Sequence, residues 1–335
     1  MSGTTSGGPV RAAMVPVTRR VRAFFAPVDR TTEEPAIFDP GKHGAFVLAS
    51  PPAPWLDLGW IDNFQRFCGT STEVLRAGAF GAVSGQFRGP LDARVEFEFR
   101  EWGKLQMALA GGSQHMNVLE PAPGAEARPS GGVALTALAV LAGSTASQIV
   151  LGAGAVDSFA IGDLVAVDAD YASQTGYVGT GISAAYVNDP LDVNRDANYI
   201  RRVTFNVGRV AGKTVTALLL AQPLLGGAPP AGASVQKVVG FVDREGGSFF
   251  QEWSGLLVAE EESGGRACFY YPRLRPCVTA GAVGFQREEM VEAARPVAAL
   301  GLRASFVALP YLDTNDGETA VCYRSYFPAM AAAVY

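Results

Sequence analysis

The chain has 335 residues, a formal net charge of -5, 48% hydrophobic residues and only 18% charged residues. This composition excludes wholesale disorder, and the negative balance argues against tight binding to nucleic-acid phosphates. The 39 glycines and 21 prolines imply many turns, which favours a mainly β protein built from short strands.

The cysteines and the apolar runs place further bounds on the protein. The longest apolar run, 133–142, is too short to cross a bilayer, and no signal peptide is read at the N-terminus. We expect a protein made in a reducing cytoplasm, with no membrane partner. No C-x-x-C pair occurs, so neither a zinc site nor a disulfide framework is predicted. The four cysteines are Cys68, Cys268, Cys277 and Cys322.

The first part of the chain, taken in order, reads as an arm followed by strands. Residues 1–18 are rich in Gly, Ser and Thr, and we expect a flexible arm that orders on assembly. A strand is expected from Arg20 onward. Residues 54–64 are dense in aromatic side chains, and short extended pieces lead from there to residue 94.

Residues 94–110, RVEFEFREWGKLQMALA, change period in the middle. The first half alternates apolar and charged residues, as in a strand with one buried and one wet face. The second half has helical spacing and stops at Gly111-Gly112. The wet face is expected to hold Arg94, Glu96, Glu98 and Arg100. The residues expected to pack a helix against the sheet are Val95, Phe97, Phe99, Trp102, Leu105 and Leu109.

Two Gly/Pro-rich linkers, 121–132 and 226–234, isolate a chemically different middle segment. Residues 131–240 contain seven Asp and no Glu, whereas the chain after them resembles its first part again. Three consecutive small units are the alternative organisation. The expected domains are the arm at 1–18, a discontinuous β domain formed by 19–125 and 238–335, and an inserted small β-barrel-like domain at 131–236.

No catalytic constellation is found in the sequence. Gly212-Lys213-Thr214 resembles the end of a phosphate loop, but the glycine spacing fails and the flanks predict a hairpin that turns at Ala211-Gly212. No G-x-S-x-G elbow occurs, and His115 is expected in a loop after the helix. We therefore predict a protein that is not an enzyme and has no catalytic residue, cofactor or metal. A hydrolase that uses His115 is left open.

Two further groups keep a functional and a structural interpretation. Asp192, Asn194 and Asp196 have the spacing that opens a calcium loop, but the required Gly and Glu are missing, so a loose ion site competes with a solvated turn. Five aromatic side chains are candidates for a sugar-stacking platform, for core packing or for a subunit interface. They are Trp55, Trp60, Phe64, Trp102 and Trp253.

The order of features resembles the bacteriophage tail tube (major tail) protein family. Four segments carry the resemblance at the level of pattern, over about the first 120 and last 95 residues. They are WLDLGW at 55–60, VEFEFREWGKLQMALAGG at 95–112, the pair GGRACFYYPRLRP and LRASFVALPYL, and DGETAVCYRSYF near the end. The segment 131–240 departs from the minimal family pattern and resembles the extra surface domains of some tube proteins.

The resemblance implies a mainly β subunit, a two-sheet antiparallel sandwich or half-barrel with one flanking α-helix. It implies rings, usually of six copies, stacked into a virion tail tube whose lumen passes DNA without specific binding. The implied partners are further copies of the chain, the tape measure and the tail terminator. The charged face of residues 94–100 is then expected to line the lumen. A β-rich tail or adhesion module that recognises a host-surface ligand is the alternative.

Overall fold

The computed structural model forms two compact units. The first comprises Met1–Val28, Pro35–Gln106 and Glu252–Tyr335, and the second Asp29–Glu34 and Met107–Gln251. The sequence had placed the boundaries near residues 125 and 238. The difference arises because β4 (Gln114–Leu119) and β11 (Ser234–Arg244) pair with each other and belong to the second unit. The structure describes residues 18–28, 34–77, 81–112, 114–124, 134–168, 184–185, 206–224, 227–244, 251–261, 264–277 and 302–328.

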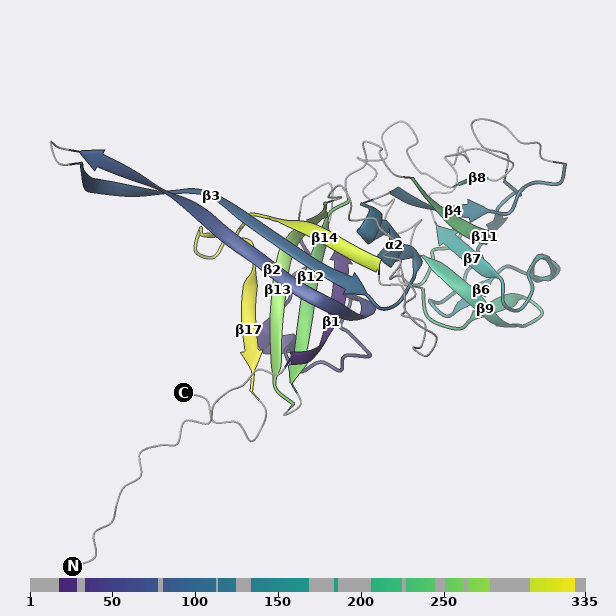
Figure 1. The fold of residues 1–335 in the computed structure, drawn as a ribbon. Coiled ribbons are helices and arrows are strands. Elements are labelled where there is room, and N and C mark those ends of the chain that lie inside the picture. Colours follow the sequence, from purple (N-terminus) through teal and green to yellow (C-terminus); the bar gives the residue numbers. More distant parts are fainter. Residues whose placement is uncertain are drawn as a thin grey trace, which may run out of the picture. The chain divides into compact units, whose positions relative to one another are not determined.

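The first unit is a closed barrel of six antiparallel strands (Figure 1). The barrel closes because β12 pairs with β1 on one side and with β13 on the other. The mainly β prediction is confirmed, and the described strands close into a barrel where a sandwich or half-barrel was expected. The barrel strands, in order around it, are β1 (Thr18–Pro27), β2 (Leu56–Ala77), β3 (Ala82–Phe99), β14 (Leu302–Leu309), β13 (Arg266–Pro276) and β12 (Trp253–Glu261).

Aromatic rings fill the interior of this barrel. Phe97 of β3 stacks on Phe306 of β14, with ring centroids 5.4 Å apart, and contacts Phe25 of β1 at 6.4 Å. Phe25 and Phe306 lie 5.3 Å apart although β1 and β14 are not paired, so the rings meet across the barrel. Val95 and Phe99 share the face of Phe97 and are also buried. These three residues therefore lie on the inner face of the barrel, and the packing of a helix against them stays a prediction.

A second apolar layer covers the outside of β1, β12 and β13. Phe38, Leu48 and Trp55 pack over Phe24 of β1, Leu256 of β12 and Tyr270 of β13. Both faces of β12 are therefore buried over its first seven residues, Trp253–Ala259. The smaller elements of this unit are α1 (Pro40–His43), β15 (Tyr311–Leu312), β16 (Thr319–Ala320) and β17 (Tyr323–Phe327), which pairs with β13.

The buried thiol of Cys268 lies in this layer and gives the barrel a testable pH dependence. Burial raises its pKa to about 11, so the folded state favours the neutral thiol. The contribution is complete below the ordinary thiol pKa and is lost as the pH rises through about 11. We expect Cys268→Ala to remove about 2 kcal/mol of the loss in unfolding free energy between pH 9 and 11, measured by urea titration. The exposed Cys68→Ala should leave the profile unchanged.

The second unit is built on an eight-stranded sheet. Its described strands do not close into a barrel, because the path ends at β6 and β8 without a pairing between them. An apolar cluster that includes Val165, Leu218 and Val235 forms its core. Besides β4 and β11, its elements are β5 (Leu138–Ala139), β6 (Gln148–Val150), η1 (Ala155–Ser158), β7 (Leu164–Asp168), β8 (Ala184–Ala185), β9 (Val207–Lys213) and β10 (Ala217–Leu220).

Two local predictions change in this part of the chain. The β9–β10 hairpin turns after Thr214, and Gly212 lies within β9. The Thr214 hydroxyl accepts from the amide nitrogens of Thr216 and Ala217, at 3.3 and 2.9 Å, which fixes the later turn. His115 lies in strand β4 and not in a loop. Residues 1–17 of the predicted N-terminal arm lie outside the described residues.

Candidate functional site

The charged face of β3 lies on the outside of the barrel. Its apolar alternates point inward, so the residues between them point outward. Arg94 and Arg100 are exposed, whereas Glu96 and Glu98 are half-buried. The sequence-predicted wet face is therefore a real outer surface, and the structure does not test whether it lines a channel.

Positive and negative side chains on this outer face form ion pairs, so their charges are locally neutralised. The guanidinium of Arg100 donates to Asp62 of β2 at 2.5 and 2.7 Å, and Arg303 of β14 donates to Glu96 at 2.7 Å. Arg94 donates to Asp92 at 3.1 Å, and the hydrogen bond that Arg100 donates to Asp62 raises the pKa of Arg100. Such exposed pairs contribute little to stability, so their main effect is a surface of mixed charge.

The boundary between the two units lies within the predicted helix. Trp102 and Leu105 belong to the first unit, and Leu109 belongs to the second. Helix α2 runs Lys104–Gly111, so Trp102 precedes it and is 43% exposed. Leu105 is buried in the first unit and Leu109 is buried in the second. Packing of this helix on the β3 sheet therefore stays a prediction.

Strands β2 and β3 continue well beyond the barrel as a two-stranded arm (Figure 1). We define the arm as residues 67–77 of β2 and 82–93 of β3, which among the described residues pair only with each other. Each strand therefore has one unpaired edge. A two-stranded ribbon is marginally stable in water, and open edges invite pairing with another chain.

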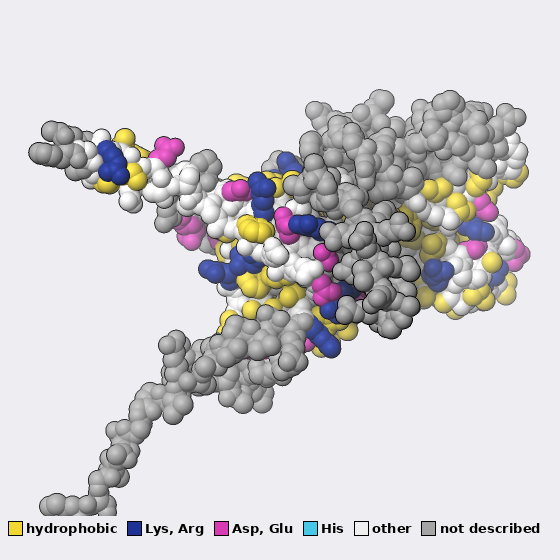
Figure 2. Space-filling model, in the orientation of Figure 1, with side chains coloured by type: hydrophobic (Ala, Val, Ile, Leu, Met, Phe, Trp, Pro, Cys, Tyr) yellow, Lys and Arg dark blue, Asp and Glu magenta, His cyan; other side chains and the backbone are white. Residues whose placement is uncertain are grey.

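The arm exposes large apolar side chains, which are interspersed with charged and other polar ones (Figure 2). Phe87 is 57% exposed and Leu75 is 53% exposed. Phe87 lies opposite Glu73, and Leu75 lies opposite Gly85, so the two share one face as diagonal neighbours. Contiguous exposed apolar groups mark interaction surfaces. The exposed apolar set of the arm is Phe67, Val74, Leu75, Val83, Phe87 and Leu91.

Arg66, at the base of the arm, turns into the barrel. Its guanidinium donates to the Tyr271 hydroxyl at 2.5 Å and lies 4.6 Å from the Phe269 ring centroid. Ile61 and Arg66 are five residues apart yet both pair with inward-facing residues of β3. A bulge between Asp62 and Gln65 shifts the alternation by one residue and makes this possible. No local sequence signal marked this arginine.

The second unit holds a cavity of about 250 Å³. Gln236 of β11 is 6% exposed and lines it. Its amide nitrogen donates to the carbonyl of Leu135 at 2.5 Å, whereas its Oε1 is buried without a hydrogen-bond partner among the described residues. An unpaired buried acceptor costs about 1–3 kcal/mol, so Gln236 is a local cost to the stability of this unit. The polar and apolar lining residues are Glu120, Leu135, Thr136, Leu138, Ser158, Phe159, Val235, Gln236 and Lys237.

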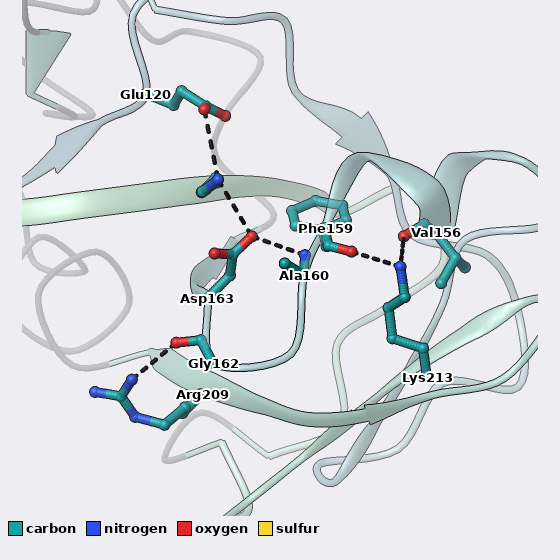
Figure 3. Close-up of polar contacts among 9 residues, drawn as sticks. Glu120, Val156, Phe159, Ala160, Gly162, Asp163, Arg209 and Lys213 are labelled. Carbon is teal, nitrogen blue, oxygen red and sulfur yellow. Dashed lines mark hydrogen bonds and ion pairs between the residues drawn. The ribbon is translucent and has the colours of Figure 1, made fainter.

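Charged side chains fix the loop that forms one wall of this cavity (Figure 3). Lys213 donates to the carbonyls of Val156 and Phe159, at 3.2 and 2.6 Å. The Asp163 carboxylate accepts from the Ala160 amide at 2.9 Å, and Arg209 donates to the Gly162 carbonyl at 2.8 Å. Five residues of the loop are thus held at their backbone or side chain.

Lys237 connects this loop to β4 across the cavity wall. Its Nζ lies 3.3 Å from Asp163 and 3.5 Å from Glu120. The hydrogen bond to Asp163 raises the pKa of Lys237. The ammonium group therefore stays charged at neutral pH and holds both carboxylates in place.

The other sequence candidates do not assemble into a site. Trp55 and Trp253 are buried, so the five aromatics do not form a sugar platform. Asp192, Asn194 and Asp196 lie outside the described residues. Within the described ranges, no three His, Cys, Asp or Glu side chains gather as metal ligands, and no helix is long and apolar enough to span a membrane.

Comparisons with known proteins do not assign the chain to a family. No protein-family model matches the chain, and no curated protein matches it.

Proposed function

We propose that the protein is a structural subunit of a bacteriophage tail tube. In this role, copies assemble into rings, usually of six, and the rings stack into a hollow virion tail. The observation that carries the proposal is the arm of residues 67–93, which offers exposed apolar side chains and open strand edges beyond a closed barrel. A second copy of the chain would cover both features.

The barrel is suited to such a subunit. Among the described residues, the sheet of the barrel has open edges only at β17 and along the arm, so self-association through strand edges is confined to these places. We propose that the barrel stands in the place of the family's two-sheet sandwich, with α2 as the flanking helix. The tape measure, the tail terminator and passing DNA are the further partners in this proposal.

The outer face of β3 would line the lumen. Its two arginines, Arg94 and Arg100, are each in an ion pair with an aspartate, which supports passage without retention, because DNA retention needs unpaired Lys and Arg. The second candidate function, a module that binds a host-surface ligand, is favoured only by the cavity of the second unit.

Electron microscopy tests the proposal directly. The purified full chain, concentrated and imaged in negative stain, should form rings or tubes with a central channel. Sedimentation velocity over a hundredfold range of concentration provides the matching solution measurement. A protein that stays monomeric throughout, and forms no tubes when tail parts are added as seeds, would contradict the proposal.

Charge reversal on the β3 face tests the lumen assignment. We expect Glu96→Lys with Glu98→Lys to leave folding intact, since both side chains lie on the outer face and the ion pair of Glu96 with Arg303 at this surface contributes only about 0–1 kcal/mol. The added positive charges should retain DNA, so ejection should slow and the effect should weaken with salt. Ejection rates of assembled particles are the measurement. Glu34→Lys with Glu318→Lys makes the same charge change at exposed positions outside this face and is the control. Normal ejection by the first variant would disprove the assignment.

A further inference from the structure

Strand β17 has an unpaired edge in the same unit as the arm. It pairs with β13 on one side, and among the described residues no strand lies along its other side (Figure 1). Each strand of the arm has an open edge as well. Both places carry backbone N–H and C=O groups that a strand of another chain can pair with.

The two edges carry opposite charges. Arg324 is exposed and is the one charged residue in the sequence of β17. The arm has two carboxylates, of which Asp92 is paired with Arg94, whereas Glu73 is exposed. Neither Glu73 nor Arg324 forms an ion pair with another described residue. Opposite charges directly across two strands stabilise a sheet, and like charges there destabilise it.

An aromatic ring lies one strand inward from each of these two charges. Phe269 of β13 is directly opposite Arg324, and it is half-buried with its ring centroid 5.5 Å from that of Phe64. Phe87 of β3 is directly opposite Glu73 and is 57% exposed. Residues directly opposite each other share a sheet face, so each charge lies beside a ring. Pairing of β2 in the arm with β17 would therefore create one row across four strands: Phe269, Arg324, Glu73 and Phe87.

We infer that the β2 edge of the arm of one copy pairs with the β17 edge of a second copy, with Glu73 opposite Arg324. The inference rests on the proposed function, since it names the surface of the next copy that receives the arm. The giving and receiving edges are different parts of the chain, so the contact is heterologous and each copy can give one arm and receive another. β17 has only five residues, so the paired segment is short and the side chains must set its register.

Disulfide cross-linking between two kinds of full chain tests the contact. Both carry Cys68→Ser, which removes an exposed thiol, and one adds Glu73→Cys while the other adds Arg324→Cys. Directly opposite residues lie close enough for a disulfide, so the oxidised mixture should contain a cross-linked dimer with this linkage in its peptide mass spectrum. The control replaces Glu73→Cys by Gln86→Cys, an exposed position on the other strand and, opposite Val74, on the other face of the arm. It should give no cross-link above background.

Charge reversal tests the same pair without a new covalent bond. Glu73→Arg alone and Arg324→Glu alone should each raise the dissociation constant for assembly about tenfold or more, because like charges then face each other. The two changes in one chain restore the attraction, so the dissociation constant should return to within about threefold of the wild-type value. Sedimentation velocity measures all three variants.

The outcomes separate this contact from the tube. A cross-linked dimer without rings or tubes in negative stain would support the contact and contradict the tube. Rings or tubes without the cross-link would overturn the contact and leave the tube in place. Single charge reversals without effect, or a double reversal that fails to restore assembly, would overturn the contact as well.

Discussion

Phe97→Ala should cost about 3–5 kcal/mol of unfolding free energy, a large part of the stability of an ordinary domain. Phe97 is 1% exposed and its ring contacts Phe25, Phe99 and Phe306. Truncation leaves a cavity between β3 and β1, which are not neighbours in the barrel, and the hydrogen-bonded wall of a closed barrel cannot collapse to fill it. The loss should therefore lie near the upper end of the range.

Tryptophan fluorescence during denaturant titration measures this loss in the correct part of the protein. All four tryptophans belong to the first unit, so the signal follows the barrel even if the second unit unfolds separately. Phe87→Ala is the matched control, because it is the same substitution at an exposed position of the same strand, and it should change stability by no more than about 0.5 kcal/mol. Equal losses in the two variants would contradict the interior position of Phe97.

The alternation in residues 94–100 was enough to predict the strand, its buried face and its wet face. What the pattern could not supply was the partner of the buried face. The same alternation fits a strand under a helix and a strand in a barrel, because period two specifies a face but not what covers it. Closure of the barrel depends on the pairing of β12 with β1, and these two strands are far apart in the sequence.

The candidate surfaces depended on features that local patterns conceal. Residues 67–93 read as ordinary short strands, and only the absence of neighbours beside them reveals an arm. Arg66 would face outward in a regular strand, and the bulge between Asp62 and Gln65 turns it inward. Gln236 is a polar residue in strand β11 and is only 6% exposed, and its amide nitrogen donates to the carbonyl of Leu135, a contact that the local pattern does not reveal.

Leu75→Asp with Phe87→Asp should abolish assembly while the barrel stays folded. The two side chains share one face of the arm and are more than half exposed, so the free subunit loses little when they change. Burial of each in a subunit contact is worth about 1.5–3 kcal/mol, so the dissociation constant should rise at least about a hundredfold. Sedimentation velocity and negative-stain imaging measure the change.

Ile161→Asp with Val215→Asp is the control for this variant, since it makes the same chemical change at two exposed apolar positions of the second unit. It should assemble as the wild type does. Tryptophan fluorescence should show both variants to have a barrel of normal stability. If the Leu75/Phe87 variant formed tubes at the same concentrations as the wild type, the arm would not be part of the subunit contact.

Mixing experiments then distinguish the two ways in which an arm can join copies. If the arm inserts into a different surface of the next subunit, the contact is heterologous and builds an extended stack. The Leu75/Phe87 variant then keeps an intact acceptor surface, so it should bind the end of a wild-type stack and stop growth there at substoichiometric amounts. If arms instead pair with each other, the contact is isologous and closes at two copies, and the variant should have no effect on wild-type assembly. Only the first outcome is compatible with a tube, because a contact that closes at two copies cannot stack rings.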